Sequence, residues 1–483
     1  MTPDQALCDP RTIVLFGIPF HDLTMDETLG RIDRLIALRS PAYLVTANLD
    51  FAAQASGDVE LHRILVEAEL VLCDGTPLVW ASRLTGQPIR ERVAGSDLAP
   101  RLAAHAEKMG YKIFLLGGEG SILDQAAGNL QRDFPNLPPV RYYSPPFAPL
   151  HEFDNQKIID AIQAARPDIL LVAFGCPKQE KWIYMHYRNL QVPCCIGVGA
   201  TIDFLAGKVS RAPAWISRLG MEWVYRMLQE PRRLAGRYLK DIFFLVRQIW
   251  RENRAIAKGG TPEASESPQT FAPSSDGIEI IRWSGALTAG REEHYPTPSL
   301  ESAFVIDLSG VSSVDSHGLG MLLRVIRRAW AADVAGCFFA PSQAVSQIVE
   351  VTRLNRILPF APDLELALLR IASEEAAARQ RPGTEMLDGG LAFKLPARLS
   401  SDLCGNLGQA VRAEWDGRPE LLELVFDFAE TTFIDSSGLG LLMRCYRMVG
   451  QREGGRLKLV NLHANVLNVI KVAKLEQFLG GSG

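Results

Sequence analysis

The sequence lacks the features that would place it in a membrane or among disulfide-stabilised proteins. None of its apolar runs approaches the ~18 residues that a spanning helix needs. The N-terminus, MTPDQALCDPRTIV, has no basic segment followed by an apolar one, so it does not resemble a signal peptide. The eight cysteines form no CxxC pair, and several lie inside apolar runs. We therefore expect reduced, buried thiols and a cytoplasmic protein.

Net charge is also low, but it is unevenly distributed. The formal net charge of the chain is -4 at pH 7. Residues 210–258 carry 11 Lys or Arg and four Asp or Glu, which gives this segment a net charge of +7. Such asymmetry indicates an anionic partner for this segment alone.

Length and composition predict a globular protein with several domains. With 47% apolar and 22% charged residues, the 483-residue chain has a globular composition and is too long for one ordinary core. Two stretches without an apolar period, 257–277 and 373–389, read as linkers. They predict domains at 1–256, 278–372 and 390–483.

The first predicted domain has the pattern of a parallel sheet covered on both faces. Continuous apolar runs alternate with longer amphipathic segments, which is typical of α/β folds; the runs are 43–48, 69–75, 111–118, 167–175 and 193–200. Ligands bind such sheets beyond the carboxyl ends of the strands. The residues that fall at this edge are Thr46, Asn48, Asp74, Gly117, Gly118, Gly175 and Gly199.

Asp74 is the carboxylate at this edge that most needs an explanation. It stands in VLCDGTP, directly after an apolar run and before Gly75. Asp-Gly is a common turn dipeptide, and Asp can cap a helix that begins near Pro77. A catalytic group at the ligand-binding edge is the alternative, and the spacing alone leaves both open.

Two further turns could bind a phosphorylated ligand. GGEGS, with Gly117 and Gly118, offers backbone N–H groups at a helix start, which suit a diphosphate. FGCPKQEKW places Lys178, Gln179 and Glu180 in the first turn of a helix, where they either bind a ligand or form a solvated helix start. Because the sequence has no Asp-x-Asp, a metal–carboxylate clamp is disfavoured, and diphosphate charge would need Arg, Lys and backbone amides.

The basic segment predicts an amphipathic helix over 237–254. One stripe holds the cations Arg237, Lys240, Arg247, Arg251 and Arg254, and the opposing side holds Tyr238, Ile242, Leu245 and Ile249. An ordinary surface helix is one interpretation, and contact with anionic lipid head groups is another. Nucleic acid is not expected as a partner, since no recognised binding motif accompanies the charge.

The C-terminal half contains an internal repeat. Residues 305–329 align without gaps on residues 425–449, and ten of the 25 positions are identical. This identity favours duplication over chance. Each copy reads as a strand, a tight Asp-Ser-x-Gly turn and a helix.

Several motifs in the first domain together resemble the WecG/TagA/CpsF family of bacterial glycosyltransferases (glycosyltransferase family 26). In chain order they are TANLDF, CDGTPLVWASRLTG, ERVAGSDL, FLLGGEGS, AFGCPKQEKWI, IGVGATIDFLAG and RAPAWISRLGMEWVYRMLQEPRRLAGRYL. The resemblance implies a Rossmann-like core and an inverting, metal-independent transfer with no cofactor. The donor would be a UDP-sugar, and the acceptor an undecaprenyl-diphosphate-linked sugar at the cytoplasmic face of the membrane. It also implies an Arg-rich C-terminal appendage that docks on the membrane and closes the active site.

The same resemblance assigns roles to individual residues. The family's catalytic Asp matches Asp74, which implies a general base, and its active-site Thr matches Thr46. The appendage arginines fall among Arg211, Arg218, Arg226, Arg232 and Arg233, and the resemblance does not decide which of them contact the diphosphate.

The two repeats resemble STAS domains, the fold of sulphate transporters and anti-sigma-factor antagonists. In that family the Ser after the turn Asp can be phosphorylated by a partner kinase, and it matches Ser316 and Ser436 here. The second copy, FIDSSGLG, keeps the Asp-Ser-x-Gly pattern of that family. The first has His317 in place of the second Ser and a shortened stretch before VIDL, where a helix is expected. A Ser next to Gly at a helix start is also an ordinary N-cap.

The sequence thus predicts an α/β glycosyltransferase followed by two small α/β STAS domains. We expect it to act in surface polysaccharide assembly, peripherally associated with the inner face of the cell membrane through residues 210–258. Regulation or assembly through a kinase or another STAS partner is expected. The alternative is a regulatory protein in which a degenerate transferase domain only binds a nucleotide sugar.

Overall fold

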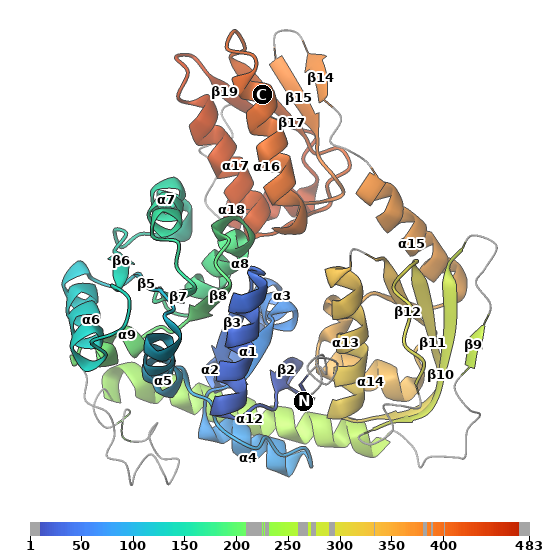
Figure 1. Ribbon diagram of the computed structural model, residues 1–483. Coiled ribbons are helices and arrows are strands. Elements are labelled where there is room, and N and C mark those ends of the chain that lie inside the picture. Colours follow the sequence, from blue (N-terminus) through green and yellow to red (C-terminus); the bar gives the residue numbers. More distant parts are fainter. Residues whose placement is uncertain are drawn as a thin grey trace. The chain divides into compact units, whose positions relative to one another are not determined.

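In the computed structural model the chain forms two compact units. Figure 1 labels the helices and strands. Unit 1 comprises Met1–Ser144, Asp160–Glu180 and Val192–Ala372, and unit 2 comprises Pro145–Ile159, Lys181–Gln191 and Ser373–Gly483. The residues that the structure describes are 10–208, 225, 227, 231–258, 269–271, 277–288, 295–332, 334–379, 384–387, 390–399 and 401–472.

The N-terminal domain is built on a six-stranded parallel sheet of order β4-β3-β8-β7-β5-β6. Its strands are β3 (Tyr43–Ala47), β4 (Leu70–Cys73), β5 (Ile113–Leu116), β6 (Arg141–Tyr143), β7 (Ile169–Val172) and β8 (Cys194–Gly197). The five predicted apolar runs each contain one of these strands, which confirms the predicted parallel sheet. Strand β6 was not predicted, because its three residues lie at the sheet edge and include no buried one.

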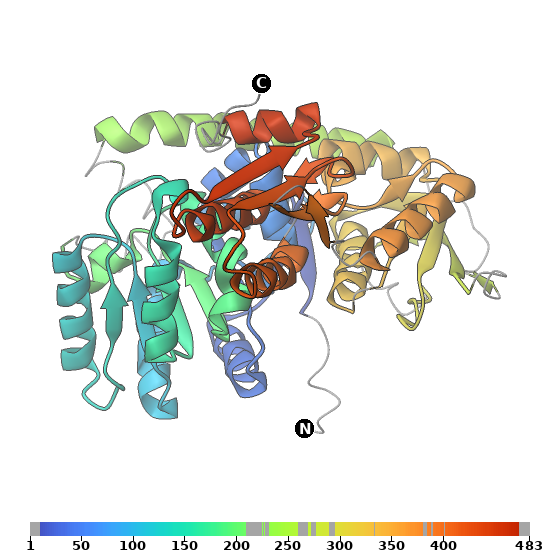
Figure 2. The same cartoon turned by 90° about the horizontal axis from the view of Figure 1, so that it is seen from above.

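Helices alternate with the strands along the chain, and those beside the sheet can be followed in Figure 2. They are α1 (Met25–Leu38), α2 (Leu49–Ala55), α3 (Val59–Glu67), α4 (Thr76–Leu84), α5 (Gly95–Met109), α6 (Gly120–Asp133), α7 (Asn155–Ala165), α8 (Lys178–Leu190) and α9 (Thr201–Leu205), with a 3-10 turn η2 (Leu150–Glu152) before α7. One hydrophobic core joins α1, α5, α6 and α9 to alternate residues of the strands. β3, β4, β5, β7 and β8 are buried along their whole length, and their sequences are apolar except for Thr46 of β3.

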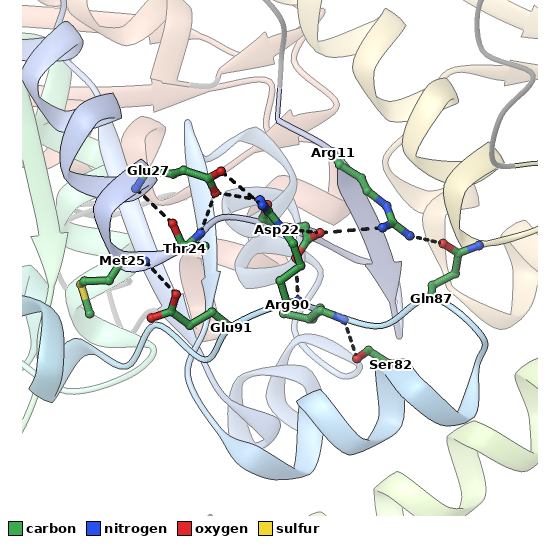
Figure 3. A network of polar contacts seen from close by, with 10 residues as sticks. Arg11, Asp22, Thr24, Met25, Glu27, Ser82, Gln87, Arg90 and Glu91 are labelled. Carbon is green, nitrogen blue, oxygen red and sulfur yellow. Dashed lines mark hydrogen bonds and ion pairs between the residues drawn. The ribbon is translucent and has the colours of Figure 1, made fainter. Parts of the chain in front are cut away.

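An antiparallel hairpin precedes the sheet and was not predicted. It pairs β1 (Thr12–Leu15) with β2 (Ile18–His21) through a two-residue turn, Phe16-Gly17, in which both φ angles are positive (56° and 82°). Polar contacts then tie the residue after β2 to the segment after α4 (Figure 3). Arg90 donates to Asp22 through its backbone N (2.8 Å) and its Nε (3.1 Å).

The long helix α12 (Pro231–Lys258) follows the N-terminal domain. It packs against α2 and α4, and further along against a helix of the first repeat, α14 (Gln343–Val351) (Figure 1). Helix α12 therefore belongs to unit 1 together with both the sheet domain and the first repeat.

The first repeat is a five-stranded sheet of order β13-β12-β11-β10-β9 with helices. Its elements are β9 (Gln269–Phe271), β10 (Glu279–Leu287), β11 (Phe304–Val314), α13 (Ser316–Ala331), β12 (Gly336–Phe339), α14, η4 (Leu354–Arg356), β13 (Phe360–Ala361) and α15 (Leu364–Arg379). The predicted strand, turn and helix are confirmed as β11, Asp315 and α13, and Asp315 is the N-cap of α13.

The second repeat has the same strand, turn and helix and an extra helix before them. Its elements are β14 (Thr384–Leu387), β15 (Gly390–Lys394), β16 (Arg398–Leu399), α16 (Ser401–Asp416), β17 (Glu423–Asp427), β18 (Phe433–Ile434), α17 (Ser436–Val449), β19 (Arg456–Val460) and α18 (Ala464–Val472). In the first repeat the described residues 295–303, which precede β11, form no helix. This agrees with the shortened stretch that the sequence shows there.

Both predicted linkers contain regular structure. Strand β9 lies within 257–277 and pairs antiparallel with β10, and α15 runs to Arg379, into the stretch 373–389. The second stretch begins as a helix because its SEEAAAR segment consists mostly of strong helix formers, which need no apolar period to extend an existing helix, and it also contains strand β14. The described cysteines are free thiols, and all of them except Cys176 are buried.

Candidate active site

Asp74 lies at the carboxyl edge of the sheet, directly after β4. Its backbone N–H donates to the Ala47 carbonyl (2.9 Å), which continues the ladder to β3. Helix α4 has Gly75 as its N-cap, with no side-chain cap bond, so Asp74 does not cap this helix. Instead its Oδ2 accepts from the N–H of Gly95, the first residue of α5 (3.2 Å). The partly exposed carboxylate is thus held between a strand end and a helix start.

Asn48 is the neighbour of this turn. It follows β3 as Asp74 follows β4, because Ala47 and Cys73 are register partners. Its side chain accepts from the Phe51 N–H (3.3 Å) and caps α2. A Cβ on Gly75 would lie 3.7 Å from the Asn48 Cβ, so the two turns are in contact. The structure therefore brings together the predicted residues Asn48 and Asp74.

Thr46 lies beneath the edge and is 6% exposed. Its Oγ1 donates to the Gly197 carbonyl over a long 3.5 Å, and a Cβ on Gly95 would approach that Oγ1 to 2.9 Å. Thr46 therefore packs under the glycine whose N–H bonds Asp74. The active-site role that the resemblance implies for Thr46 stays a prediction.

The glycine turn after β5 has the predicted form. Gly117 and Gly118 both have positive φ (95° and 81°). A Cβ on Gly117 would meet the Phe174 ring at 2.7 Å, whereas nothing lies within 4 Å of a Cβ on Gly118, which is exposed. Helix α6 follows with Glu119 as N-cap and no side-chain cap bond. This turn leaves space in which backbone amides can meet an anion.

Gln179 and Glu180, at the start of α8, are buried and do not form a solvated helix start. Gln179 is 3% and Glu180 1% exposed. The Gln179 Oε1 accepts from the N–H groups of Gly175 and Gly199, both at 3.1 Å, and its Nε2 donates to Glu180 (2.6 Å). Gln179 thus ties the turn after β7 to the turn after β8. Lys178 is less buried, with its Nζ 5.6 Å from the centre of the Phe174 ring.

The buried carboxyl of Glu180 predicts a pH-dependent stability. Burial raises the pKa of Glu180 from its usual 4.5 to about 7. The folded state then binds the Glu180 proton more tightly than the unfolded state does, and this difference adds to the free energy of unfolding. The contribution is complete below about pH 4.5 and disappears as the pH rises to about 7. Glu180→Gln keeps the acceptor for Gln179 and should remove about 3 kcal/mol of this pH dependence. Native-state hydrogen exchange of β7 and β8 amides across this pH range measures it.

The control for this prediction is Glu119→Gln, which changes an exposed carboxylate at the start of α6. It should leave the pH dependence of the exchange as in the unmodified chain. Equal pH dependence in Glu180→Gln and Glu119→Gln would contradict the assignment to Glu180.

The predicted appendage arginines cannot be placed. Arg211, Arg218 and Arg226 lie outside the described residues, and Arg232 and Arg233 belong to the first turns of α12, whose side chains are not described. Their role therefore stays a prediction.

The described part of α12 has an unexpected orientation. Its buried residues are polar: Asp241, Gln248 and Glu252. Its exposed residues include an apolar stripe, with Leu239 69%, Ile242 44%, Phe243 70%, Val246 63% and Trp250 60% exposed. Exposed cations flank the stripe, namely Arg237, Lys240, Arg247 and Arg254. Of the four residues expected opposite the cations, Ile242 is exposed, whereas Tyr238, Leu245 and Ile249 are half-buried.

Hydrogen bonds explain why the polar side of α12 faces inward. Glu252 accepts from the Phe16 N–H at the hairpin turn (3.1 Å), and Gln248 donates to the Val351 carbonyl at the end of α14 (3.1 Å). Burial raises the pKa of Glu252 to about 8. None of the helices among the described residues is long and apolar enough to cross a bilayer.

The family model "Glycosyl transferase WecG/TagA/CpsF family" matches residues 13–258, half of the chain. The chain belongs to the WecG/TagA/CpsF family. It is a glycosyl transferase, as predicted, with STAS domains matched at residues 256–367 and 377–480. The transferase match ends where α12 ends, and the first STAS match begins before β9.

Curated relatives agree with this assignment. The chain is 31% identical over 217 residues to the N-acetylglucosaminyldiphosphoundecaprenol N-acetyl-beta-D-mannosaminyltransferase of Bacillus spizizenii, covering 45% of this chain and 82% of the relative. It is 30% identical over 246 residues to the protein of the same name from Staphylococcus aureus (strain MW2), covering 50% of this chain and 94% of the relative. The matches span the transferase part of the chain.

Two features of this WecG/TagA/CpsF site were missed by sequence reasoning. Gly95 contacts Asp74 and Thr46 although it lies 21 residues from Asp74. Gln179 bridges two turns by its side chain. The only sequence signals are that Gly95 stands in ERVAGSDL and Gln179 in AFGCPKQEKWI, both conspicuous motifs. Among the described residues, no group of three His, Cys, Asp or Glu could hold a metal ion.

Proposed function

We propose that this protein is an inverting transferase that moves a hexose, of the N-acetylmannosamine type or another, from a UDP-sugar to an undecaprenyl-diphosphate-linked acceptor in surface polysaccharide synthesis. The observation that carries the proposal is the Asp74 carboxylate, which is partly exposed at the carboxyl edge and fixed by Gly95 (3.2 Å). The names of the relatives support a lipid-linked acceptor.

An inverting transfer needs only one carboxylate. Asp74 takes the proton of the acceptor hydroxyl while that oxygen attacks the anomeric carbon from the face opposite the diphosphate. The bond to the diphosphate oxygen breaks, and UDP leaves with the bonding electrons. The amides of the Gly117-Gly118 turn, Lys178 and the arginines of the appendage are the groups available to stabilise that charge without a metal. Asn48 lies beside Asp74 and can orient the sugar hydroxyls.

The apolar stripe of α12 supports peripheral binding to the inner face of the cell membrane. An exposed apolar stripe flanked by Arg and Lys is the pattern of a helix that lies in a lipid interface. The cations meet anionic head groups while the apolar side chains enter the acyl boundary. Such docking would bring the sheet edge to a substrate that is itself anchored in the bilayer.

Regulation through the STAS domains also remains a proposal, with Ser436 as the phosphorylated residue. Ser436 is the first residue of α17, where helix N–H groups favour a phosphate, although Asp435 beside it repels one. The presence of Thr46, Asp74 and the Arg-rich appendage argues against the rival hypothesis of a degenerate, purely regulatory transferase domain.

Release of UDP tests the proposal. The purified full chain is incubated with a panel of UDP-sugars that includes UDP-N-acetylmannosamine, with undecaprenyl-diphosphate-linked N-acetylglucosamine in detergent or vesicles. We expect UDP release that requires both the acceptor and one particular donor. Donor binding without UDP release for every donor and acceptor would instead support the regulatory hypothesis.

A further inference from the structure

The first STAS domain packs on the transferase domain over a continuous surface within unit 1. Helix α13 packs against strand β1, and α14 packs against α12. Val14 of β1 and Val66 of α3 belong to the same hydrophobic cluster as the core of the STAS domain, with Trp283, Leu322 and Ile326. The two domains therefore share a core.

The guanidinium group of Arg327, in α13, forms hydrogen bonds across this interface. Its Nη2 donates to the carbonyls of Ala68 (2.5 Å) and Glu69 (3.4 Å), which follow the end of α3. Its Nη1 lies 3.2 Å from Nε2 of the buried His21. A cation at the end of a helix meets the unpaired carbonyls there and the negative end of the helix dipole.

The Asp-Ser turn of the first STAS domain is engaged by the transferase domain. One carboxylate oxygen of Asp315 caps α13, accepting from the N–H groups of His317 (2.9 Å) and Gly318 (2.8 Å). The other accepts from the Gln87 side chain (3.2 Å), whose own oxygen accepts from Arg11 (2.8 Å), a pair visible in Figure 3. Ser316, in the same turn, is 6% exposed.

Two glycines show how closely the backbones approach. A Cβ on Gly320 of α13 would lie 2.9 Å from the Thr12 carbonyl oxygen of β1. A Cβ on Gly17, at the hairpin turn, would lie 2.2 Å from the Thr352 carbonyl oxygen after α14. Larger side chains at these positions would have to push backbone aside, so the sequence permits this contact by keeping glycine at both.

The second STAS domain repeats the pattern in unit 2. With the offset of 120 residues between the copies, Gly440 aligns with Gly320 and Arg447 with Arg327. A Cβ on Gly440 would lie 3.5 Å from Sδ of Met185, and Arg447 lies 4.0 Å from Asp154; both partners belong to the transferase part of the sequence. Packing is looser here, since a cavity of about 530 Å³ remains between these elements.

We infer that the helix after the Asp-Ser turn of these STAS domains is a docking surface for the transferase domain of the same chain. In the first copy, this docking is permanent. That copy then acts as a fixed part of the transferase, and together with the hairpin turn it holds α12 by way of Val351 and Glu252. A regulator could reach the Ser316 turn only after the interface had opened. The inference goes beyond the proposed chemistry and does not depend on it.

The test cuts the folded full chain at both ends of the first STAS domain. Protease sites are introduced between residues 259 and 268 and between residues 380 and 383, and the cleaved protein is captured by an N-terminal tag. The middle fragment should stay bound. Arg327→Ala and Gly320→Leu should each raise its dissociation constant about 10- to 100-fold, as expected for a lost charged hydrogen bond or a backbone clash. Gln87→Ala, a change on the transferase side, should raise it about 3- to 10-fold.

Matched controls separate docking from folding. Arg328→Ala removes the adjacent, exposed arginine of α13, and Gly128→Leu enlarges an exposed glycine of α6 with nothing within 4 Å of its Cβ. Both should retain the middle fragment as the unmodified chain does. Release of that fragment from the unmodified chain on cleavage overturns the inference. So does retention in Arg327→Ala, Gly320→Leu and Gln87→Ala that equals retention in the controls.

Discussion

Asp74→Asn should lower the transfer turnover by about 10² or more while leaving the fold and donor binding intact, because the amide cannot accept the acceptor proton. The substitution is nearly isosteric, and the amide oxygen can still accept from the Gly95 N–H, which the carboxylate does at 3.2 Å. Steady-state UDP release gives the turnover, and calorimetric titration with UDP-sugar gives donor affinity.

Asp168→Asn is the matched control for this experiment. Asp168 is the carboxylate at the opposite edge of the same sheet, just before β7, where it accepts from Arg39 (2.7 Å) and the Lys112 N–H (2.9 Å). Its substitution should reduce stability and leave the turnover of the folded protein unchanged. Near-normal turnover in Asp74→Asn would return Asp74 to the role of a turn residue.

The strand-end residues could be predicted because a buried parallel sheet produces a simple sequence pattern. Strands buried on both faces are continuously apolar, so the first polar residue after each run marks the carboxyl edge. That pattern located Asn48, Asp74 and the Gly117-Gly118 turn correctly at the edge. The burial of Thr46, Gln179 and Glu180 could not be predicted, because it depends on contacts with Gly95, Gly175 and Gly199, which are distant in the chain.

The orientation of α12 shows a second limit of sequence patterns. A helical wheel assigns apolar residues to the packed side, whereas the buried side chains of α12 are polar and lie beside Phe244, which packs on Phe16. The reason is that Gln248 and Glu252 have partners in the hairpin turn and at the end of α14, and those partners come from segments more than 100 residues away. Hydrophobic periodicity alone cannot separate a helix that packs by polar contacts from one that packs by apolar ones.

The exposed apolar stripe of α12 predicts that apolar residues, as well as cations, bind the protein to the membrane surface. Phe243→Glu together with Trp250→Glu should reduce binding to vesicles of phosphatidylglycerol and phosphatidylcholine about 10²-fold or more. Each side chain loses the ~1.5–3 kcal/mol of apolar burial and places a charge at an anionic surface. Because the two residues are 70% and 60% exposed, the fold should tolerate the change. Vesicle flotation of the purified full chain measures the binding.

Two further variants separate apolar from electrostatic binding. Leu366→Glu with Leu369→Glu makes the same change on exposed apolar residues of α15, which are 48% and 58% exposed, and should leave flotation unchanged. Arg247→Glu with Arg251→Glu should weaken flotation at low salt and matter less at high salt, because head-group attraction is screened whereas apolar insertion is not. If the α12 and α15 double variants float equally well, α12 does not enter the lipid interface, and its apolar stripe must be covered by something other than a membrane.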